Sequence, residues 1–151
     1  MPLELYSKNI EVRWSDLDPN FHVRHSVYYD YGASVRIDFL QENGIHLKLM
    51  QEKAVGLVIF REECVFKKEI GMNDNISVDI KLLKATTDYS RWSIQHMIFK
   101  NVHTLSAILT LDGSWMDIIK RKLTMPPEEG INAFEYMPRA EQFEWLTKII
   151  I

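Results

Sequence analysis

Residues 12–44, VRWSDLDPNFHVRHSVYYDYGASVRIDFLQENG, decide the fold, because they join the end of a strand, a polar loop and one long helix. Steps of 100° per residue place two apolar sets on adjoining thirds of that helix and leave a narrow polar strip. The first set is Tyr28, Tyr31, Gly32, Val35 and Phe39, and the second is Tyr29, Ala33, Ile37 and Leu40. A surface helix has a wider polar face, so we expect protein around most of this one.

Signals at both ends set the limits of the helix. Ser26 is a suitable N-cap, Asp30 near the first turn suits the helix dipole, and Gly44 is a stop signal. Arg36 interrupts the apolar arc, and a charge there costs free energy unless it has a partner. The sequence thus predicts a largely buried helix over residues 27–43, with a polar partner for Arg36.

The loop before the helix has the composition of a functional site. Asp16, Asp18, Asn20 and His22 alternate with apolar residues in the run DLDPNFH. Asp-Pro followed by Asn is ordinary turn material, so one interpretation is a loop whose side chains cap its own backbone. His22, and the position of the loop between a strand and a helix, favour a site that carries chemistry.

The run RWSDLDPNFHVRHSVYY resembles the signature loop of hotdog-fold thioesterases, which read roughly D-x-D-x-x-x-H-V-N-N-x-x-Y at the head of their central helix. Asp18 stands where the 4-hydroxybenzoyl-CoA thioesterase-like branch keeps its catalytic carboxylate. The run from Asp18 to His22 is similar to the D-x-N-x-H of acyl-ACP thioesterases. The other matching residues are Asp16, Val23 and Tyr28, and Arg36 falls where many members carry an arginine.

This resemblance implies hydrolysis of an acyl-CoA or acyl-ACP thioester, with Asp18 as a base or a nucleophile. Asn20 would orient substrate or water, and His22 would help to move the proton. Arg24, His25 and Tyr28 are the residues expected to contact the substrate, whose CoA or phosphopantetheine is the only cofactor-like group. Asp16 is expected to brace the loop rather than to react.

Thioester chemistry agrees with such a site. The leaving thiol, like cysteine, has a pKa of about 8.5 and departs with little acid assistance, so the site must polarise the carbonyl and activate or replace water. Backbone amides 24–26 at the helix start suit the first task, and Asp18 suits the second. His22, His25 and Asp18 also suggest a metal site, but their spacing matches no recognised zinc pattern, so no metal is expected.

Two departures from the resembled pattern leave alternatives open. The Asn-Asn pair of the signature is Arg24-His25 here, and the glutamate usual on the helix is Ala33. A hotdog module that binds an acyl thioester without turnover is therefore one alternative. A hotdog dehydratase that uses His22 and a carboxylate is another.

Composition limits the classes of protein. The chain has 151 residues, 46% of them hydrophobic, which is enough for one domain with a sizeable core. A net charge of -3 argues against a nucleic-acid partner, and no apolar run is long enough to span a membrane. Cys64 alone makes no disulfide and is expected in the core or at an interface. With no secretory signal evident at the N-terminus, these features favour the cytoplasm. The basic run 120–122 is expected to be a solvated turn or strand end, and near the site mouth it would meet phosphates.

Strand patterns fill most of the remaining chain. Alternating or continuous apolar runs predict strands over residues 6–14, 54–68, 76–82, 91–99 and 105–119. A bend is expected near Arg61, and Gly113 suggests another bulge or bend. Residues 45–53 are expected to form a short helix or an irregular connection, and residues 71–75 a turn.

One long helix followed by several strands predicts an α+β domain, in which a curved antiparallel sheet wraps the central helix. Residues 1–127 are assigned to this single hotdog domain. Residues 128–151 are assigned to a C-terminal extension, with a short helix over residues 139–150 that packs on the domain or on a neighbouring subunit. The resemblance further implies a homodimer or a dimer of dimers, with the sites at the subunit interface.

Overall fold

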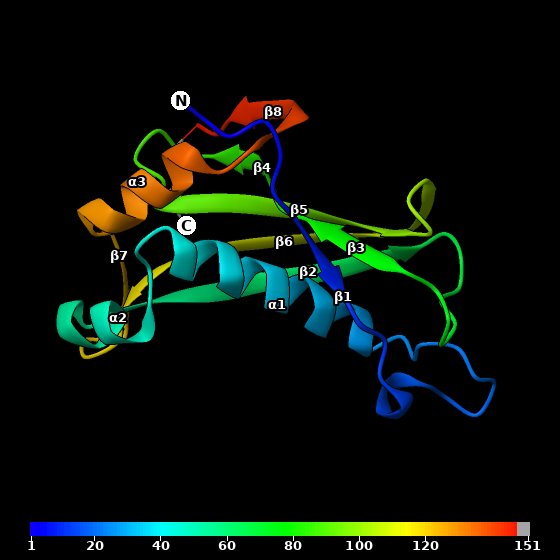
Figure 1. Cartoon of the computed structure of the whole chain (residues 1–151). Helices are drawn as coiled ribbons and strands as arrows, with labels where there is room; N and C mark the ends of the chain where they lie inside the picture. Colours follow the sequence, from blue (N-terminus) through cyan, green and yellow to red (C-terminus); the bar gives the residue numbers. More distant parts are fainter. Residues whose placement is uncertain (148–151) are drawn as a thin grey trace.

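Helix α1 (Val27–Glu42) lies along the concave face of a curved sheet in the computed structural model, which describes residues 1–147 (Figure 1). The predicted first apolar set is buried: Val35 and Phe39 have no exposed surface, and Tyr28 and Tyr31 are at most 5% exposed. Burying an apolar side chain of this size contributes about 1.5–3 kcal/mol, so this face anchors the helix. The second set is covered less than expected, because Ile37 is 52% exposed.

The predicted limits of α1 are close to the observed ones. Ser26 occupies the N-cap position, but its side chain accepts no hydrogen bond from the helix. Gly44 has a φ of 89°, a left-handed conformation that glycine adopts without strain, and it follows the helix as predicted. The next segment, expected to be a helix or a connection, forms the short helix α2 (Leu47–Lys53).

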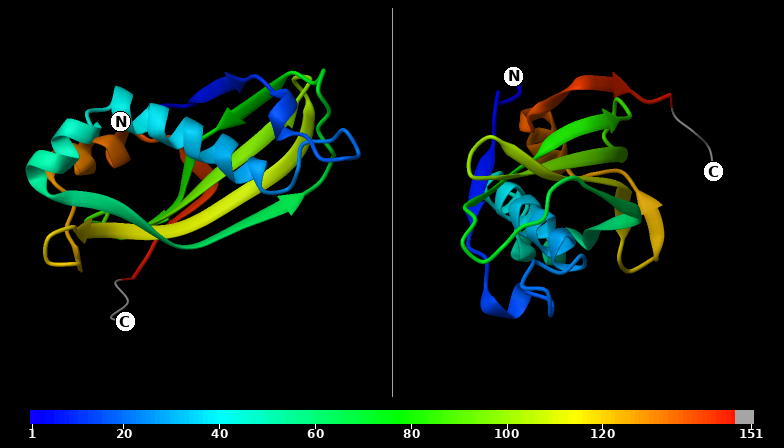
Figure 2. Two further views of the ribbon diagram at one scale, coloured as in Figure 1. Left: turned by 90° about the horizontal axis from the view of Figure 1, so that it is seen from below. Right: turned by 90° about the vertical axis from the view of Figure 1, so that its right-hand side faces the viewer.

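Three long strands make the middle of the sheet, in the order β2, β6, β5, and all pair antiparallel. One end of β5 pairs with β3, which pairs with β1, and the other end pairs with β4, which pairs with β8. Figure 2 shows the sheet curving around α1. The strands are β1 (Ser7–Ile10), β2 (Val55–Phe66), β3 (Ile76–Asp79), β4 (Lys81–Ala85), β5 (Arg91–Lys100), β6 (Thr104–Asp117), β7 (Lys122–Thr124) and β8 (Arg139–Trp145). The predicted α+β hotdog arrangement is confirmed.

Local irregularities in the strands differ in part from those predicted. The pairing of β2 with β6 shifts between Ile59 and Arg61, where a bend was expected. Gly113 lies opposite this shift but stays in register with Trp92. A Cβ atom on Gly113 would come within 2.3 Å of the Trp92 ring, so the glycine is needed for close approach and makes no bulge in β6.

Two predicted strands are shorter than expected. The strand predicted over residues 6–14 ends at Ile10, and Trp14, expected to point inward, is 71% exposed in a short 3-10 helix, η1 (Trp14–Asp16). The strand predicted over residues 76–82 divides at Ile80 into β3 and β4, because these halves pair with different neighbours.

The C-terminal segment corrects the helix predicted over residues 139–150. The helix α3 lies earlier, at Glu128–Tyr136, and Arg139–Trp145 forms β8, which pairs parallel with β4. Phe134 of α3 lies 5.8 Å from the rings of both Trp92 and Trp115, which fixes α3 in the core. Pairing along the otherwise open edge of β4 outweighs the weak helical pattern of β8. Residues 148–150 of the predicted helix lie outside the described residues.

No helix within residues 1–147 is long and apolar enough to cross a membrane.

Candidate active site

The loop between β1 and α1 is braced from inside by Asp16. This carboxylate is fully buried and accepts hydrogen bonds from the backbone and guanidinium of Arg13, both 3.0 Å away, and from the Tyr31 hydroxyl at 2.9 Å. Burial alone would raise the pKa of Asp16, but these bonds outweigh it and hold the pKa below its usual range. Asp16 is therefore the loop brace that the sequence predicted.

Asp18 sits at a tight turn. Its Oδ1 accepts hydrogen bonds from the backbone N–H groups of Asn20, at 2.9 Å, and His22, at 3.3 Å. Its carbonyl accepts from Phe21, whose φ of 64° is left-handed. The loop thus turns at residues 19–20 and is not extended. This turn is the arrangement that the capping interpretation predicted. In residues 1–147, Oδ2 of Asp18 has no hydrogen-bond partner and is free for a ligand.

A pocket of about 310 Å³ opens beside Asp18, between the start of α1 and the end of β2. Tyr28 forms one wall and is 3% exposed, and the edge of its ring packs on Phe66, with centroids 4.9 Å apart. The lining residues are Asp18, Val23, His25, Tyr28, Phe66, Lys67, Lys68 and Glu69. The pocket thus combines a carboxylate, an apolar wall and a cationic rim.

The backbone at the start of α1 adds hydrogen-bond donors. Three amides, those of residues 24–26, were predicted to converge here, but the N–H of Arg24 already donates to the Asp16 carbonyl at 2.9 Å. The N–H groups of His25 and Ser26 find no acceptor within the described part of the chain. Because the positive end of the helix dipole lies at the same place, these two amides suit a developing oxyanion.

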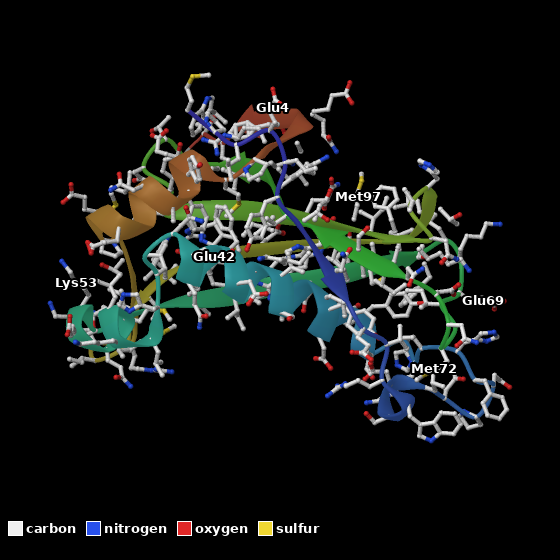
Figure 3. All side chains as sticks on the ribbon, in the orientation of Figure 1. Glu4, Glu42, Lys53, Glu69, Met72 and Met97 are labelled. Atoms are coloured by element: carbon white, nitrogen blue, oxygen red, sulfur yellow. The ribbon has the colours of Figure 1, made fainter. Side chains whose placement is uncertain are left out.

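The structure separates the six predicted site residues into two groups. Asp18, His25 and Tyr28 line the pocket. Asn20 is exposed outside it, and the Arg24 guanidinium donates to the carbonyl of Ser15. His22 Nε2 lies 3.6 Å from a carboxylate oxygen of Glu69, which lines the pocket. Figure 3 labels Glu69 beside the chain that leads out of the sheet.

Sequence reasoning missed the cationic rim. Lys67 and Lys68 follow β2 directly, and both backbone N–H groups donate to the carbonyl of Ser106. The signal was a basic pair between a predicted strand and the predicted turn at residues 71–75. The basic run 120–122 lies instead at the opposite end of the sheet, where residues 120–121 belong to the turn between β6 and β7 and Lys122 begins β7 (Figure 1).

Other reactive groups near the site are inactive in this geometry. Cys64 is a free, half-buried thiol on β2, and burial, with a further contribution from Glu62, raises its pKa to about 11. It is therefore almost fully protonated near neutral pH, which agrees with a packing role. Among the described residues, no three His, Cys, Asp or Glu side chains form a group that could hold a metal ion.

A comparison with protein families identifies the family of the chain that carries this site. Residues 12–134 match the model of the thioesterase-like superfamily. The chain belongs to that superfamily. Its match begins before the Asp18 loop and ends within α3, so it includes the loop, α1 and most of the sheet. Membership supports thioester hydrolysis as the general activity. No curated protein matches the chain in sequence.

Solved structures of similar shape agree with the hotdog fold of the superfamily. A hypothetical protein from Staphylococcus aureus, in complex with CoA, has a TM-score of 0.82 at 20% identity and covers 100% of this chain and 98% of its own. A 1,4-dihydroxy-2-naphthoyl-CoA thioesterase from Synechocystis has a TM-score of 0.77 at 14% identity, with 86% and 95% covered. A putative oleoyl thioesterase from Lactobacillus plantarum has a TM-score of 0.81 at 14% identity. This match covers 97% of this chain and 54% of that protein.

Proposed function

We propose that this protein hydrolyses acyl-CoA thioesters, with Asp18 as the general base or nucleophile. The observation that carries the proposal is the Asp18 carboxylate in a pocket that is also lined by His25, whose backbone N–H has no acceptor in the described chain. Only Oδ1 of Asp18 is held by the loop, so Oδ2 is left to accept a proton from water or to attack the carbonyl. The capping bonds thus orient the carboxylate and do not consume it.

The amides of His25 and Ser26 would polarise the thioester carbonyl. A carbonyl oxygen that becomes an oxyanion gains most from donors fixed beforehand, and loss of one such donor costs about 3–4 kcal/mol in known enzymes. Tyr28 and Phe66 would hold the acyl group beside this position through apolar contact. The side chain of Arg24, exposed and held by the Ser15 carbonyl, would contribute through the rigidity of the loop.

Lys67 and Lys68 suit the phosphates of CoA, the acyl donor that we propose. Both line the pocket, where a nucleotide phosphate approaching the thioester would meet them. Hydrolysis of an acyl-ACP remains the alternative, and the same rim would then face the phosphopantetheine phosphate. The CoA complex of the Staphylococcus aureus protein shows that a protein of this fold accepts CoA.

The predicted catalytic roles of the Asn20 and His22 side chains remain predictions. Their backbone N–H groups hold Oδ1 of Asp18, which gives both residues a positioning role through the main chain. His22 lies beside Glu69, which lines the pocket, and this places the imidazole near the site where it would help to move a proton.

We further propose that two copies pair along β2. Within residues 1–147 this strand pairs only with β6, so its other edge offers a row of unpaired backbone groups. Four apolar side chains of β2, Ile59, Phe60, Val65 and Phe66, are 42–51% exposed. Since Phe66 also lines the pocket, such pairing would place the site at the subunit interface. Assembly of two dimers into a tetramer stays a prediction.

The molecular mass of the protein, measured by light scattering as it elutes from a size-exclusion column, tests the proposed dimer. The wild type should have twice the mass of the chain, and Val65→Glu should shift the protein toward the monomer through repulsion at the interface. A wild-type monomer at all concentrations would contradict the pairing.

Release of free thiol from a panel of acyl-CoAs tests the activity. Asp18→Asn should lower kcat/KM by about 10²–10⁴, as expected for loss of a general base, whereas the matched Asp38→Asn on the outer strip of α1 should not. Equal rates for Asp18→Asn and the wild type would refute the assignment. Tight acyl-CoA binding without thiol release would indicate a binding module, and hydration of an enoyl thioester would indicate a dehydratase.

A further inference from the structure

The middle of α1 carries a buried cation that meets a neutral partner. Arg36 is 9% exposed, and its Nη1 lies 2.9 Å from Nε2 of the fully buried His96. Nδ1 of His96 lies 2.7 Å from the carbonyl oxygen of Asp79. A carbonyl only accepts hydrogen bonds, so Nδ1 carries the proton and Nε2 accepts from Arg36. Burial, followed by the charge of Arg36, lowers the pKa of His96 to about 3, so the imidazole is neutral.

The charge of Arg36 is therefore not matched by an adjacent anion. Among the described residues no carboxylate oxygen lies within the 4.0 Å of an ion pair with this guanidinium, and Glu62 acts on it only at longer range. A guanidinium has five N–H donors, and the structure gives one of them a partner. A buried cation with unused donors is costly unless an anion completes it.

Arg36 also lines a second pocket, of about 260 Å³, between α1, β2, β5 and α3. Its other walls are apolar and include Leu40, Leu57, Trp92 and Phe134. Arg36 thus brings unused donors to an apolar pocket, where an acceptor from a ligand would satisfy them.

This second pocket lies on the same seam as the Asp18 pocket. Phe66, near the end of β2, packs on Tyr28 at the start of α1, while Leu57, near the start of β2, lines the pocket of Arg36. Tyr28 and Arg36 are eight residues apart on α1, which corresponds to about 12 Å along the helix axis at 1.5 Å per residue. An acyl chain whose thioester meets Asp18 would extend along this seam toward Arg36.

We propose that the Arg36 pocket receives the far end of the acyl group, and that Arg36 selects acyl-CoAs that carry a carboxylate at that end. The proposal rests on the proposed thioesterase function and names its substrate class, the CoA monothioesters of dicarboxylic acids. A carboxylate supplies both the negative charge that Arg36 lacks and acceptors for its unused N–H groups. The apolar walls hold the methylene chain that leads to it.

Matched substrates test the selection. We would compare kcat/KM for decanoyl-CoA and for the CoA monothioester of decanedioic acid, with shorter and longer pairs to locate the best length. The wild type should prefer the dicarboxylic member of the best pair by about tenfold or more, as expected for one charge-assisted contact. Arg36→Met should abolish the preference, whereas Arg61→Met, at an exposed arginine paired with Glu63, should keep it.

A second variant covers the possibility that Arg36→Met does not fold. Ile37 lines the same pocket and is 52% exposed, so Ile37→Glu places a negative charge at the pocket with little effect on the core. It should lower the rate with the dicarboxylic substrate and leave the rate with decanoyl-CoA nearly unchanged. Equal use of both substrates by the wild type, or equal losses on both in each variant, would overturn the proposal.

Binding separates this proposal from the proposed function. Calorimetric titration with free decanedioate and decanoate needs no turnover. The wild type should bind decanedioate more tightly than decanoate, and Ile37→Glu should weaken the binding of decanedioate. Binding of this kind without thiol release would support the subsite while the thioesterase assignment fails. Thiol release from both substrates, without any preference in rate or binding, would refute the subsite and leave the thioesterase assignment standing.

Discussion

Two polar regions of this molecule can be compared, one in the loop that leads into α1 and one near the middle of that helix. In the loop, Asp18 is only partly held by backbone N–H groups and faces a pocket with solvent access. Near the middle, Arg36, His96 and the Asp79 carbonyl form a chain of hydrogen bonds inside the core. The comparison teaches that groups left free at the surface can react, whereas buried ones are fixed by each other and determine stability and specificity.

The largest effect on stability is expected where the buried series of hydrogen bonds through His96 is interrupted. His96→Leu removes the acceptor of Arg36 and the donor to Asp79, which leaves a buried cation unpaired. We expect a loss of about 3 kcal/mol in the free energy of unfolding, measured with denaturant. His96→Gln keeps an acceptor and a donor on one side chain and should lose about 1 kcal/mol or less. Equal losses for the two variants would show that packing, not hydrogen bonding, matters there.

Acid should distinguish the same residue. The pKa of His96 is lowered by burial to about 3 in the folded protein, against about 6.5 for an ordinary histidine. Because the folded pKa is the lower one, the unfolded state binds the proton first, and stability is lost as the pH falls from 6.5 toward 3. The slope from this residue is about 1.4 kcal/mol per pH unit. Between pH 6.5 and 3, the free energy of unfolding of the wild type should therefore fall more steeply than that of His96→Gln, which cannot titrate there. Parallel curves of stability against pH for the two proteins would contradict this prediction.

A smaller loss of stability is expected at the first region. Asp16→Asn weakens the hydrogen bonds from Arg13 and Tyr31 that brace the loop. We expect it to lower the free energy of unfolding by about 2 kcal/mol. Since the pKa of Asp16 is lowered in the fold, its contribution is present above its unfolded pKa of about 3.8 and is lost as the pH falls below that value. Thermal unfolding measures the change, with Tyr31→Phe as the control that removes one bond only. No change in either variant would mean that the loop is held by other contacts.

The smallest effect is expected at the rim of the Asp18 pocket. Lys67→Ser and Lys68→Ser each remove one exposed charge near the CoA phosphates and should raise KM for an acyl-CoA a few-fold, with little change in kcat. Added salt should raise the wild-type KM and affect the variants less. Lys120→Ser, at the other end of the sheet, is the matched control. An equal change in KM for Lys120→Ser would show that Lys67 and Lys68 do not contact the substrate.

Prediction from the sequence succeeded where a pattern is local. The apolar spacing of α1, the stop at Gly44 and the braced Asp16 follow from residues close together in the chain. It failed where pairing is distant: β8 is a strand because the edge of β4 was open, and residue 14 turns outward because β1 ends early. Of the candidate site, the resemblance placed Asp18, His25 and Tyr28, which share a pocket.

The sequence by itself determined the kind of chemistry and the central helix, because a motif and a helical period are both read from neighbouring residues. Only the tertiary structure decided which charges meet. His96 had no visible partner in the sequence, and Arg36 needed one; they are 60 residues apart and become neighbours only when β5 pairs into the sheet behind α1. Partners across a sheet depend on the register of several strands at once, and no local spacing encodes that register.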